Sequence, residues 1–245
     1  MKDLESATDS SATSRTGTAI IEDRWPRLET VEVTTGPDPV AAIIWLHGLG
    51  ADGHDFEPAV PQLLWPGAPP LRWVFPHAPM RAVTLNGGLQ MRAWYDILSI
   101  DSDRGHDVAG IEQSVSQVAS LVQREQRRGI HPHRVVVAGF SQGGAIAIHL
   151  ALRYSQRLAG LIALSTYMVH SDRLRGQAHP INRDLPVFMA HGSMDGVVPL
   201  PMGVAAADAL RAWGYALEWR EYTMAHAVCP EEIAHIRAWL GKRLS

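Results

Sequence analysis

Short apolar runs alternate with longer segments of helical periodicity along most of the chain. The apolar runs have the length and composition of strands buried on both faces of a sheet, and they occupy residues 41–46, 71–75, 134–138, 160–164, 185–190 and 216–222. The clearest helical spacing of three and four is shown by Val108, Ile111, Val115, Val118 and Val122. This alternation predicts an α/β fold with a mostly parallel central sheet and helices on both faces.

The two ends of the chain differ in composition. Residues 1–24 are rich in Ser, Thr and Ala with scattered charge, so we expect a flexible N-terminal arm that buries little apolar surface. Residues 28–33 are expected to form an edge strand, stopped by the turn signal Gly-Pro-Asp-Pro at 36–39. We expect residues 25–245 to form a single domain, since a chain of this length can bury a substantial core.

A serine flanked by glycines stands between a predicted strand and a predicted helix. The sequence Gly-Phe-Ser-Gln-Gly at 139–143 follows the apolar Val135–Val137 and precedes an apolar helical stretch at 144–148. This is the setting of a nucleophile elbow, in which small residues let the backbone bend sharply and expose the hydroxyl to a basic imidazole. Ser141 is the expected nucleophile.

An elbow of this kind requires an acid and then a histidine, each just beyond the carboxyl end of a strand. Asp195 follows a predicted strand, whereas Asp184 precedes the same strand and Asp208 falls within a helical pattern. Of the two later histidines, His235 lies inside a helical pattern and His226 lies in a short loop after a strand. The order and placement predict Asp195 as the acid and His226 as the base.

A second loop has the composition of an oxyanion hole. His-Gly-Leu-Gly at 47–50 directly follows an apolar run, which is where the N–H donors of an oxyanion hole belong. We expect the amides of Leu49 and Gln142 to be these donors, and His47 to orient its loop by hydrogen bonding. No cysteine or carboxylate stands at zinc-like spacing beside His47, so we expect no metal, and the predicted chemistry needs no organic cofactor.

Six segments together carry a family resemblance, and they lie at 47–53, 75–79, 83–88, 91–96, 139–144 and 191–199. In them the chain resembles the carboxylesterase and acyl-protein thioesterase family (phospholipase/carboxylesterase family) of α/β-hydrolases, over about residues 28–243. The resemblance implies an α/β-hydrolase fold, and the segment 166–184 is too short for a large cap domain. It also implies the same five positions as the residue-by-residue reasoning, namely Ser141, Asp195, His226, Leu49 and Gln142.

The chain departs from the pattern of that family at two positions. Ala227 stands where the family often has a serine after the catalytic histidine, and Ser193 stands where it often has an aspartate. Neither is a catalytic position, so the departures bear on loop rigidity and rate rather than on the class of reaction.

The segment from Pro79 to Ser99 crosses the edge of the sheet where the site is expected. Its apolar side chains are candidates for the wall of an acyl pocket, and we select Leu85, Met91 and Trp94 as substrate-binding candidates. The alternative for Trp94 is an ordinary core position, because aromatic residues dominate protein cores.

These features predict a serine hydrolase, a carboxylesterase that cleaves esters of small or medium acyl chains through an acyl-enzyme. An acyl-protein thioesterase or a lysophospholipase would use the same triad, so both stay open. A non-catalytic binding module on the same fold is the alternative from a different class. The expected partner is a small-molecule ester or acyl-thioester, and a homodimer is left open.

Charge and cysteine content bear on the expected partners and location of the protein. The net charge of −3 gives no electrostatic reason to expect nucleic acid, and no apolar run has the length of a membrane span. The start of the chain lacks the layout of a secretory signal, and the single Cys229 allows no intramolecular disulfide. We therefore expect a cytoplasmic protein without stable membrane insertion.

Overall fold

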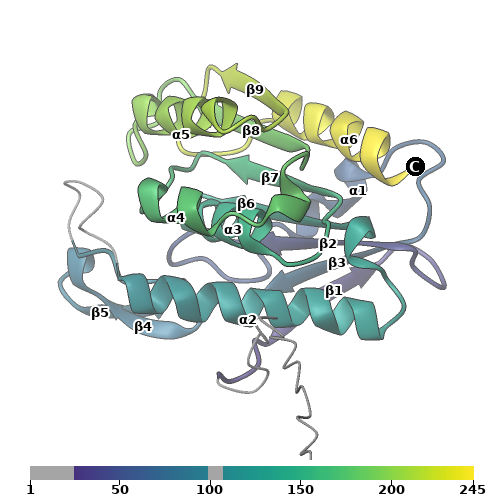
Figure 1. Ribbon diagram of the computed structural model, residues 1–245, viewed down its shortest axis with the longest axis horizontal. Helices are drawn as coiled ribbons and strands as arrows, with labels where there is room; N and C mark the ends of the chain where they lie inside the picture. The colour runs from purple at the N-terminus through teal and green to yellow at the C-terminus, as the bar shows by residue number, and fades with distance from the viewer. Residues whose placement is uncertain (1–24, 99–106) are drawn as a thin grey trace, which may run out of the picture.

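The computed structural model describes residues 25–98 and 107–245 and is built around a seven-stranded sheet (Figure 1). The strand order is β1-β3-β2-β6-β7-β8-β9, and every pair is parallel except the antiparallel pair of β1 with β3. The strands are β1 (Thr30–Thr34), β2 (Ala41–Leu46), β3 (Leu71–Pro76), β6 (Val135–Phe140), β7 (Gly160–Leu164), β8 (Val187–Gly192) and β9 (Leu217–Tyr222). The predicted mostly parallel sheet and the edge position of its first strand are confirmed. The arm expected at 1–24 lies outside the described residues.

Helices cover both faces of the sheet, as predicted (Figure 1). One face is covered by α2 (Val108–Arg127), α3 (Gln142–Arg153), α4 (Ser171–Gln177) and α5 (Leu200–Ala212). The other face is covered by α1 (Val60–Leu63) and α6 (Pro230–Leu244). The segment 166–184 contributes only α4 and a 3-10 turn at Pro180–Asn182, so it is not a cap domain.

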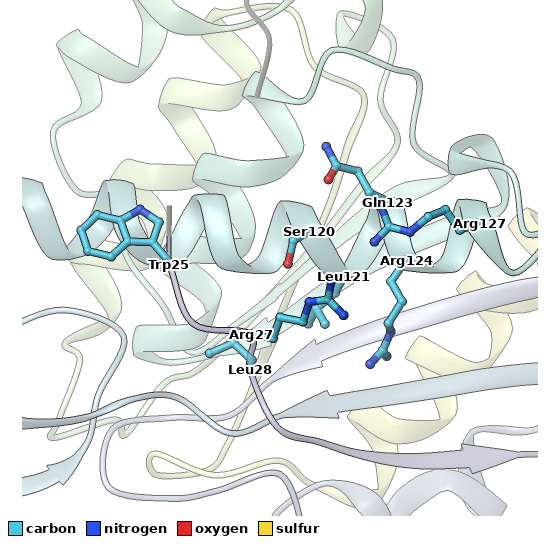
Figure 2. Close-up of a pocket in the computed structure, with 8 residues that line it drawn as sticks. All are labelled: Trp25, Arg27, Leu28, Ser120, Leu121, Gln123, Arg124 and Arg127. Atoms are coloured by element: carbon cyan, nitrogen blue, oxygen red, sulfur yellow. The ribbon is translucent and has the colours of Figure 1, made fainter. Parts of the chain in front are cut away.

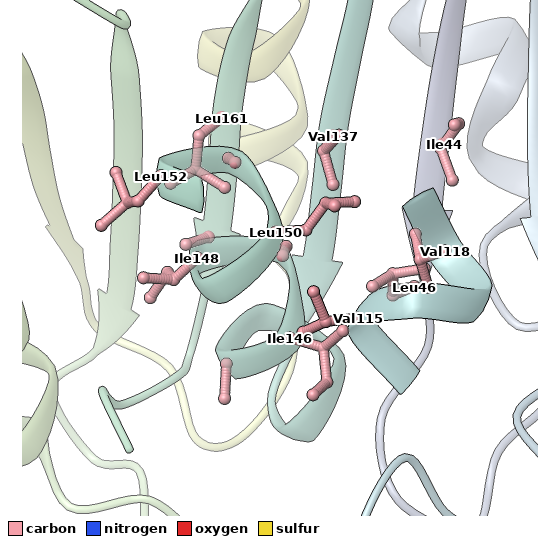
Figure 3. Close-up of a cluster of buried hydrophobic side chains, with 14 of the residues drawn as sticks. Ile44, Leu46, Val115, Val118, Val137, Ile146, Ile148, Leu150, Leu152 and Leu161 are labelled. Carbon is pink, nitrogen blue, oxygen red and sulfur yellow. The ribbon is translucent and has the colours of Figure 1, made fainter. Parts of the chain in front are cut away.

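Strand β2 shows why the apolar runs are continuous. Its six side chains are at most 1% exposed, and they alternate between the two faces of the sheet. Ile44 and Leu46 pack toward α2 and α3, whereas Ile43 and Trp45 pack toward α1 and α6. Figure 3 shows the first of these cores, where side chains of α3 fill the space above the central strands. A strand that is covered on both faces has no position for a polar side chain.

A hairpin that the sequence did not predict stands beside the start of α2 (Figure 1). Strands β4 (Met80–Val83) and β5 (Leu89–Arg92) pair antiparallel, and Gly87 and Gly88 take positive φ at their turn. Arg81 of β4 lies 3.7 Å from Asp107, the N-cap residue of α2. The hairpin therefore fills part of the segment that was expected to cross the carboxyl edge of the sheet.

None of the helices in 25–98 and 107–245 is long and apolar enough to cross a lipid bilayer.

Candidate active site

Ser141 sits at a strained turn between β6 and α3. Its φ of 54° and ψ of −122° lie outside the regions that a non-glycine residue usually occupies. The strain is held by hydrogen bonds on both sides: the Ser141 N–H donates to Leu164 O at 2.9 Å, and the Thr166 hydroxyl donates to Ser141 O at 2.7 Å. These bonds fix the backbone, so the side chain is directed by the turn, as an elbow requires.

The glycines around Ser141 are required by close backbone contacts. A Cβ at Gly143 would lie 2.5 Å from the carbonyl oxygens of Leu46 and His47, and a Cβ at Gly139 would collide with Gly143 O. The loop after β2 and the elbow after β6 are thus packed backbone against backbone, which brings the predicted oxyanion loop to the predicted nucleophile.

Asp195 and His226 form a hydrogen-bonded pair at the carboxyl ends of β8 and β9. The His226 Nδ1 lies 2.7 Å from Asp195 Oδ2, and Asp195 Oδ1 accepts from the amides of Val197 and Val198 at 2.9 and 2.8 Å. The Asp195 side chain is fully buried. A buried acid held by three donors keeps one ring nitrogen of His226 engaged and leaves Nε2 for proton transfer.

The loops that carry this pair are joined through backbone bonds. The Ser193 N–H donates to Tyr222 O at 2.8 Å, and the Met194 N–H donates to Met224 O at 3.0 Å. Because Ser193 contributes its amide to this contact, the departure of its side chain from the family pattern leaves the connection between the loops in place.

The imidazole lies against the nucleophile elbow. The ring centroids of His226 and Phe140 are 4.7 Å apart, and Phe140 directly precedes Ser141 in the chain. Within the described residues the Ser141 hydroxyl makes no hydrogen bond to His226. Bonds between a nucleophile and its base often tighten only when substrate is bound, so the arrangement stays compatible with a triad.

The predicted oxyanion loop packs directly on Ser141. A Cβ at Gly48 would lie 3.4 Å from Ser141 Cβ, and the Gly50 N–H is tied to Arg92 O at 2.9 Å. Among the described backbone bonds, the Leu49 N–H has no acceptor. The Gln142 N–H is the first of α3 and lacks an intrahelical acceptor by its position. The two amides proposed from sequence are thus both available beside Ser141.

The His47 ring is fixed in one tautomer by two hydrogen bonds, one of them to its own loop. Its Nδ1 donates to Gly48 O at 2.7 Å, and its Nε2 accepts from the Ala78 N–H at 3.0 Å. Burial lowers the pKa of His47 to about 4, so the ring is neutral at physiological pH. The hydrogen bonds are those expected of a residue that orients the loop.

The side chain of Gln142 carries contacts that sequence reasoning missed. Its Oε1 accepts from the Trp94 N–H at 2.8 Å, and its Nε2 donates to Tyr95 O at 2.7 Å. The motif marks only the amide of this residue, and no spacing rule connects it to a segment almost fifty positions earlier.

The three substrate candidates lie in different surroundings. Met91 lies near the oxyanion loop, since its Sδ is 3.9 Å from where a Cβ on Gly50 would be, and Leu85 is 43% exposed on the hairpin turn. Trp94 has no exposed surface at all. The structure supports the alternative interpretation of Trp94 as a core residue, because a side chain without exposed surface offers no face to a substrate.

A separate cavity of about 260 Å³ lies between the first described residues and α2 (Figure 2). It is lined by Trp25, Arg27, Leu28, Ser120, Leu121, Gln123, Arg124 and Arg127, none of which is a predicted site residue. In the described part of the chain, no three His, Cys, Asp or Glu side chains gather in a way that could hold a metal ion.

The chain is similar in sequence to known acyl-protein thioesterases. The chain is 34% identical over 234 residues to acyl-protein thioesterase 1 of Cryptococcus neoformans, covering 89% of this chain and 98% of that protein. It is 38% identical over 215 residues to acyl-protein thioesterase 1 of Neurospora crassa, covering 83% and 87%. These names favour the thioesterase alternative over the carboxylesterase that the sequence analysis placed first.

Solved structures show the same fold. The crystal structure of Arabidopsis thaliana SOBER1 superposes with a TM-score of 0.77 at 30% identity, over 84% of this chain and 99% of that one. Zea mays acyl-protein thioesterase 2 gives a TM-score of 0.77 at 27% identity, over 89% and 100%. The sequence model described as phospholipase/carboxylesterase matches residues 28–244. The chain therefore belongs to the phospholipase/carboxylesterase family of α/β-hydrolases.

Proposed function

We propose that this hydrolase cleaves acyl-thioesters, with Ser141 as nucleophile, His226 as general base and Asp195 as the acid that orients it. The 2.7 Å bond between His226 and Asp195 at the edge of the sheet that also carries the strained Ser141 is the observation that supports this assignment most.

The reaction proceeds in two steps. His226 Nε2 takes the proton from Ser141 as Oγ attacks the acyl carbonyl, and it returns that proton to the departing thiolate, which leaves as a thiol. A water molecule, deprotonated by the same nitrogen, then attacks the acyl-enzyme. The bond between the acyl carbon and Ser141 Oγ breaks, His226 returns the proton to Oγ, and the carboxylic acid is released.

The amides of Leu49 and Gln142 stabilise the negative oxygen of both tetrahedral intermediates. Donors that are fixed before the reaction need no reorganisation, and one such donor contributes on the order of 10²-fold to 10³-fold in rate. The backbone packing of Gly143 against residues 46 and 47 supports their placement.

The exposed apolar side chains of the β4–β5 hairpin, beside the loop at 47–50, favour a substrate with a long apolar acyl chain. Met80, Leu85 and Leu89 are 59%, 43% and 63% exposed there, although apolar side chains are usually buried. Together with the names of the relatives, this favours an acyl-thioester with a long chain over a small ester.

Carboxylic ester hydrolysis is the second candidate, because the same triad and oxyanion hole accept either leaving group. A cytoplasmic location without a nucleic-acid partner belongs to the same proposal. It is supported by the net charge of −3 and the single cysteine.

A substrate panel tests the proposal. Initial rates are compared for a peptide with a palmitoylated cysteine, and for p-nitrophenyl esters of two-carbon and sixteen-carbon acids. The expected result is a higher kcat/KM for the acyl-thioester than for either ester, with every rate abolished in Ser141→Ala. A preference for the two-carbon ester would instead favour a small-ester carboxylesterase, and no turnover of any of the three would favour a binding module.

A further inference from the structure

Trp94 has every polar atom of its main chain and side chain in a hydrogen bond. Its N–H donates to Gln142 Oε1 at 2.8 Å, and its indole Nε1 donates to His47 O at 2.9 Å. Its carbonyl oxygen accepts from the Ser114 hydroxyl of α2. The side chain is completely buried, so none of these bonds competes with water.

Two of these partners belong to the two arms of the proposed oxyanion hole. Gln142 directly follows Ser141 and supplies one amide, and His47 stands two residues before Leu49, which supplies the other. Gln142 Nε2 also donates to Tyr95 O at 2.7 Å. The Trp94–Tyr95 backbone therefore hydrogen-bonds both the oxygen and the nitrogen of the Gln142 side-chain amide.

The bond from the indole is not a routine feature of this core. The Nε1 atoms of Trp45, Trp65 and Trp73 are also buried, and none of them has a hydrogen-bond partner within the described residues. A buried N–H without a partner is costly, yet the fold tolerates it at three other tryptophans. The Trp94 indole, in contrast, has a partner, and that partner is the His47 carbonyl oxygen at the start of the predicted oxyanion loop.

We propose that Trp94 is a positioning residue that sets the separation between the Leu49 and Gln142 amides, and so holds the oxyanion hole ready before substrate arrives. The inference rests on the proposed function. Trp94 does not touch the substrate; it acts through the two segments that carry the donors. A displacement of about 1 Å in such a site can lower the rate by about 10²-fold.

The central test is Trp94→Phe, with Trp73→Phe as the matched control. Both changes remove the same atoms from a fully buried indole, but only the first breaks a hydrogen bond. The rate is expressed as kcat per active site, counted from the end-point of fluorophosphonate labelling, so that unfolded protein does not contribute. The expected result is a kcat about 10-fold to 100-fold lower in Trp94→Phe, with KM little changed and the Trp73→Phe value near wild type.

Two further readouts separate positioning from a general loss of packing. The affinity for a long-chain trifluoromethyl ketone, whose adduct with Ser141 carries an oxyanion, should fall by the same factor as kcat in Trp94→Phe. The pH dependence of kcat/KM should stay in place, because the His226–Asp195 pair makes no bond with Trp94.

If Trp94→Phe does not fold, two smaller changes test the positioning role of Trp94. Ser114→Ala removes the donor to Trp94 O, and Gln142→Glu keeps an acceptor for the Trp94 N–H but loses the donor to Tyr95 O. Both should lower kcat per labelled site, Gln142→Glu more than Ser114→Ala. Unchanged kcat and unchanged ketone affinity in the folded variants would overturn the role of Trp94. A wild-type protein that takes up no fluorophosphonate at Ser141 would instead overturn the proposed function, so the two failures are distinguishable.

Discussion

Two buried polar regions lie on opposite faces of the sheet, and their polar groups are hydrogen-bonded to very different degrees. Around Trp94 and Gln142, side-chain and backbone groups are paired at 2.7–2.9 Å. At the first turn of α6, which follows the loop of His226, Glu232 is fully buried, and within residues 25–98 and 107–245 neither of its carboxylate oxygens has a hydrogen bond of normal geometry. The proposed oxyanion donors are thus held by paired polar groups, whereas the loop of the proposed base leads into a helix whose buried carboxylate is not satisfied in this way.

The difference has an electrostatic consequence. Burial raises the pKa of Glu232 to about 8, and the Cys229 amide offsets only part of this effect. The Glu232 carboxyl group therefore stays largely protonated at neutral pH, because burial makes its charged form costly. Buried polar groups stabilise a fold only when they are paired. We therefore expect the region around Trp94 and Gln142 to be rigid, and the stability of the region around Glu232 to depend on pH.

The largest expected effect comes from the acid on the histidine side. Asp195→Asn keeps the shape of the side chain but no longer holds His226 in the required tautomer, and we expect kcat to fall about 10⁴-fold. Steady-state kinetics with the acyl-thioester peptide measure this. The control is Asp208→Asn, an exposed residue paired with Arg211, which should leave kcat unchanged. Near-normal activity of Asp195→Asn would remove Asp195 from the triad.

The next largest expected effect concerns how the buried Glu232 makes stability depend on pH. In the folded protein Glu232 keeps its proton up to about pH 8, whereas in the unfolded chain it loses the proton near 4.5, so wild-type stability falls as pH rises between these values. Glu232→Gln does not titrate. Relative to wild type, its free energy of unfolding should rise from pH 5 to pH 8 by about 1.4 kcal/mol for each pH unit.

Urea denaturation at several pH values measures this difference. The control is Glu231→Gln, which changes the exposed neighbour in the same turn of α6. If Glu232→Gln and Glu231→Gln gave the same pH-independent change, the buried carboxyl would not be the origin of the effect.

A smaller effect tests the rigidity of the elbow. A Cβ at Gly144 would lie 2.7–2.9 Å from the side chain of Thr166, which itself is bonded to Ser141 O. Gly144→Ala should therefore lower the free energy of unfolding by about 1–3 kcal/mol, because a tightly packed site cannot absorb the methyl group. In α4, a Cβ at Gly176 would meet no atom of the described part of the chain within 4 Å, so Gly176→Ala should be neutral or slightly stabilising. Equal stability of the two variants would show that the elbow yields to the added methyl group.

The smallest effect is expected at Thr166 itself. Thr166→Val deletes the hydroxyl that donates to Ser141 O and keeps the branched shape, and we expect a loss of about 1 kcal/mol. Ser141 O also accepts from the amides of Gly144 and Ala145, which limits the cost. Thermal denaturation measures it. A loss as large as that of Gly144→Ala would show that the hydroxyl matters more to the turn than the packing does.

The sequence predicted the parts of this molecule that are set by short-range patterns. The runs buried on both faces predicted the sheet, and the order Ser141, Asp195, His226 placed three residues at the ends of β6, β8 and β9, where the structure has them. The hairpin β4–β5 escaped because its strands have four residues each and are partly exposed, so they lack an apolar run.

Other features are long-range and leave no local trace. The bonds from Trp94 to His47 and Gln142 span 47 and 48 positions, and the burial of Glu232 depends on how α6 packs against the sheet. An acidic residue in the first turn of a helix is normally solvated and favourable, so the sequence alone gives no reason to expect that Glu232 is buried.

The account depends most on the hydroxyl of residue 141 being the activated nucleophile. Incubation with a fluorophosphonate, digestion and mass spectrometry locate the modified residue directly. We predict one stoichiometric phosphonyl adduct on the peptide with Ser141, lost in Ser141→Ala and strongly slowed in Asp195→Asn. An intact peptide at 141 together with undiminished thioester cleavage would contradict the account.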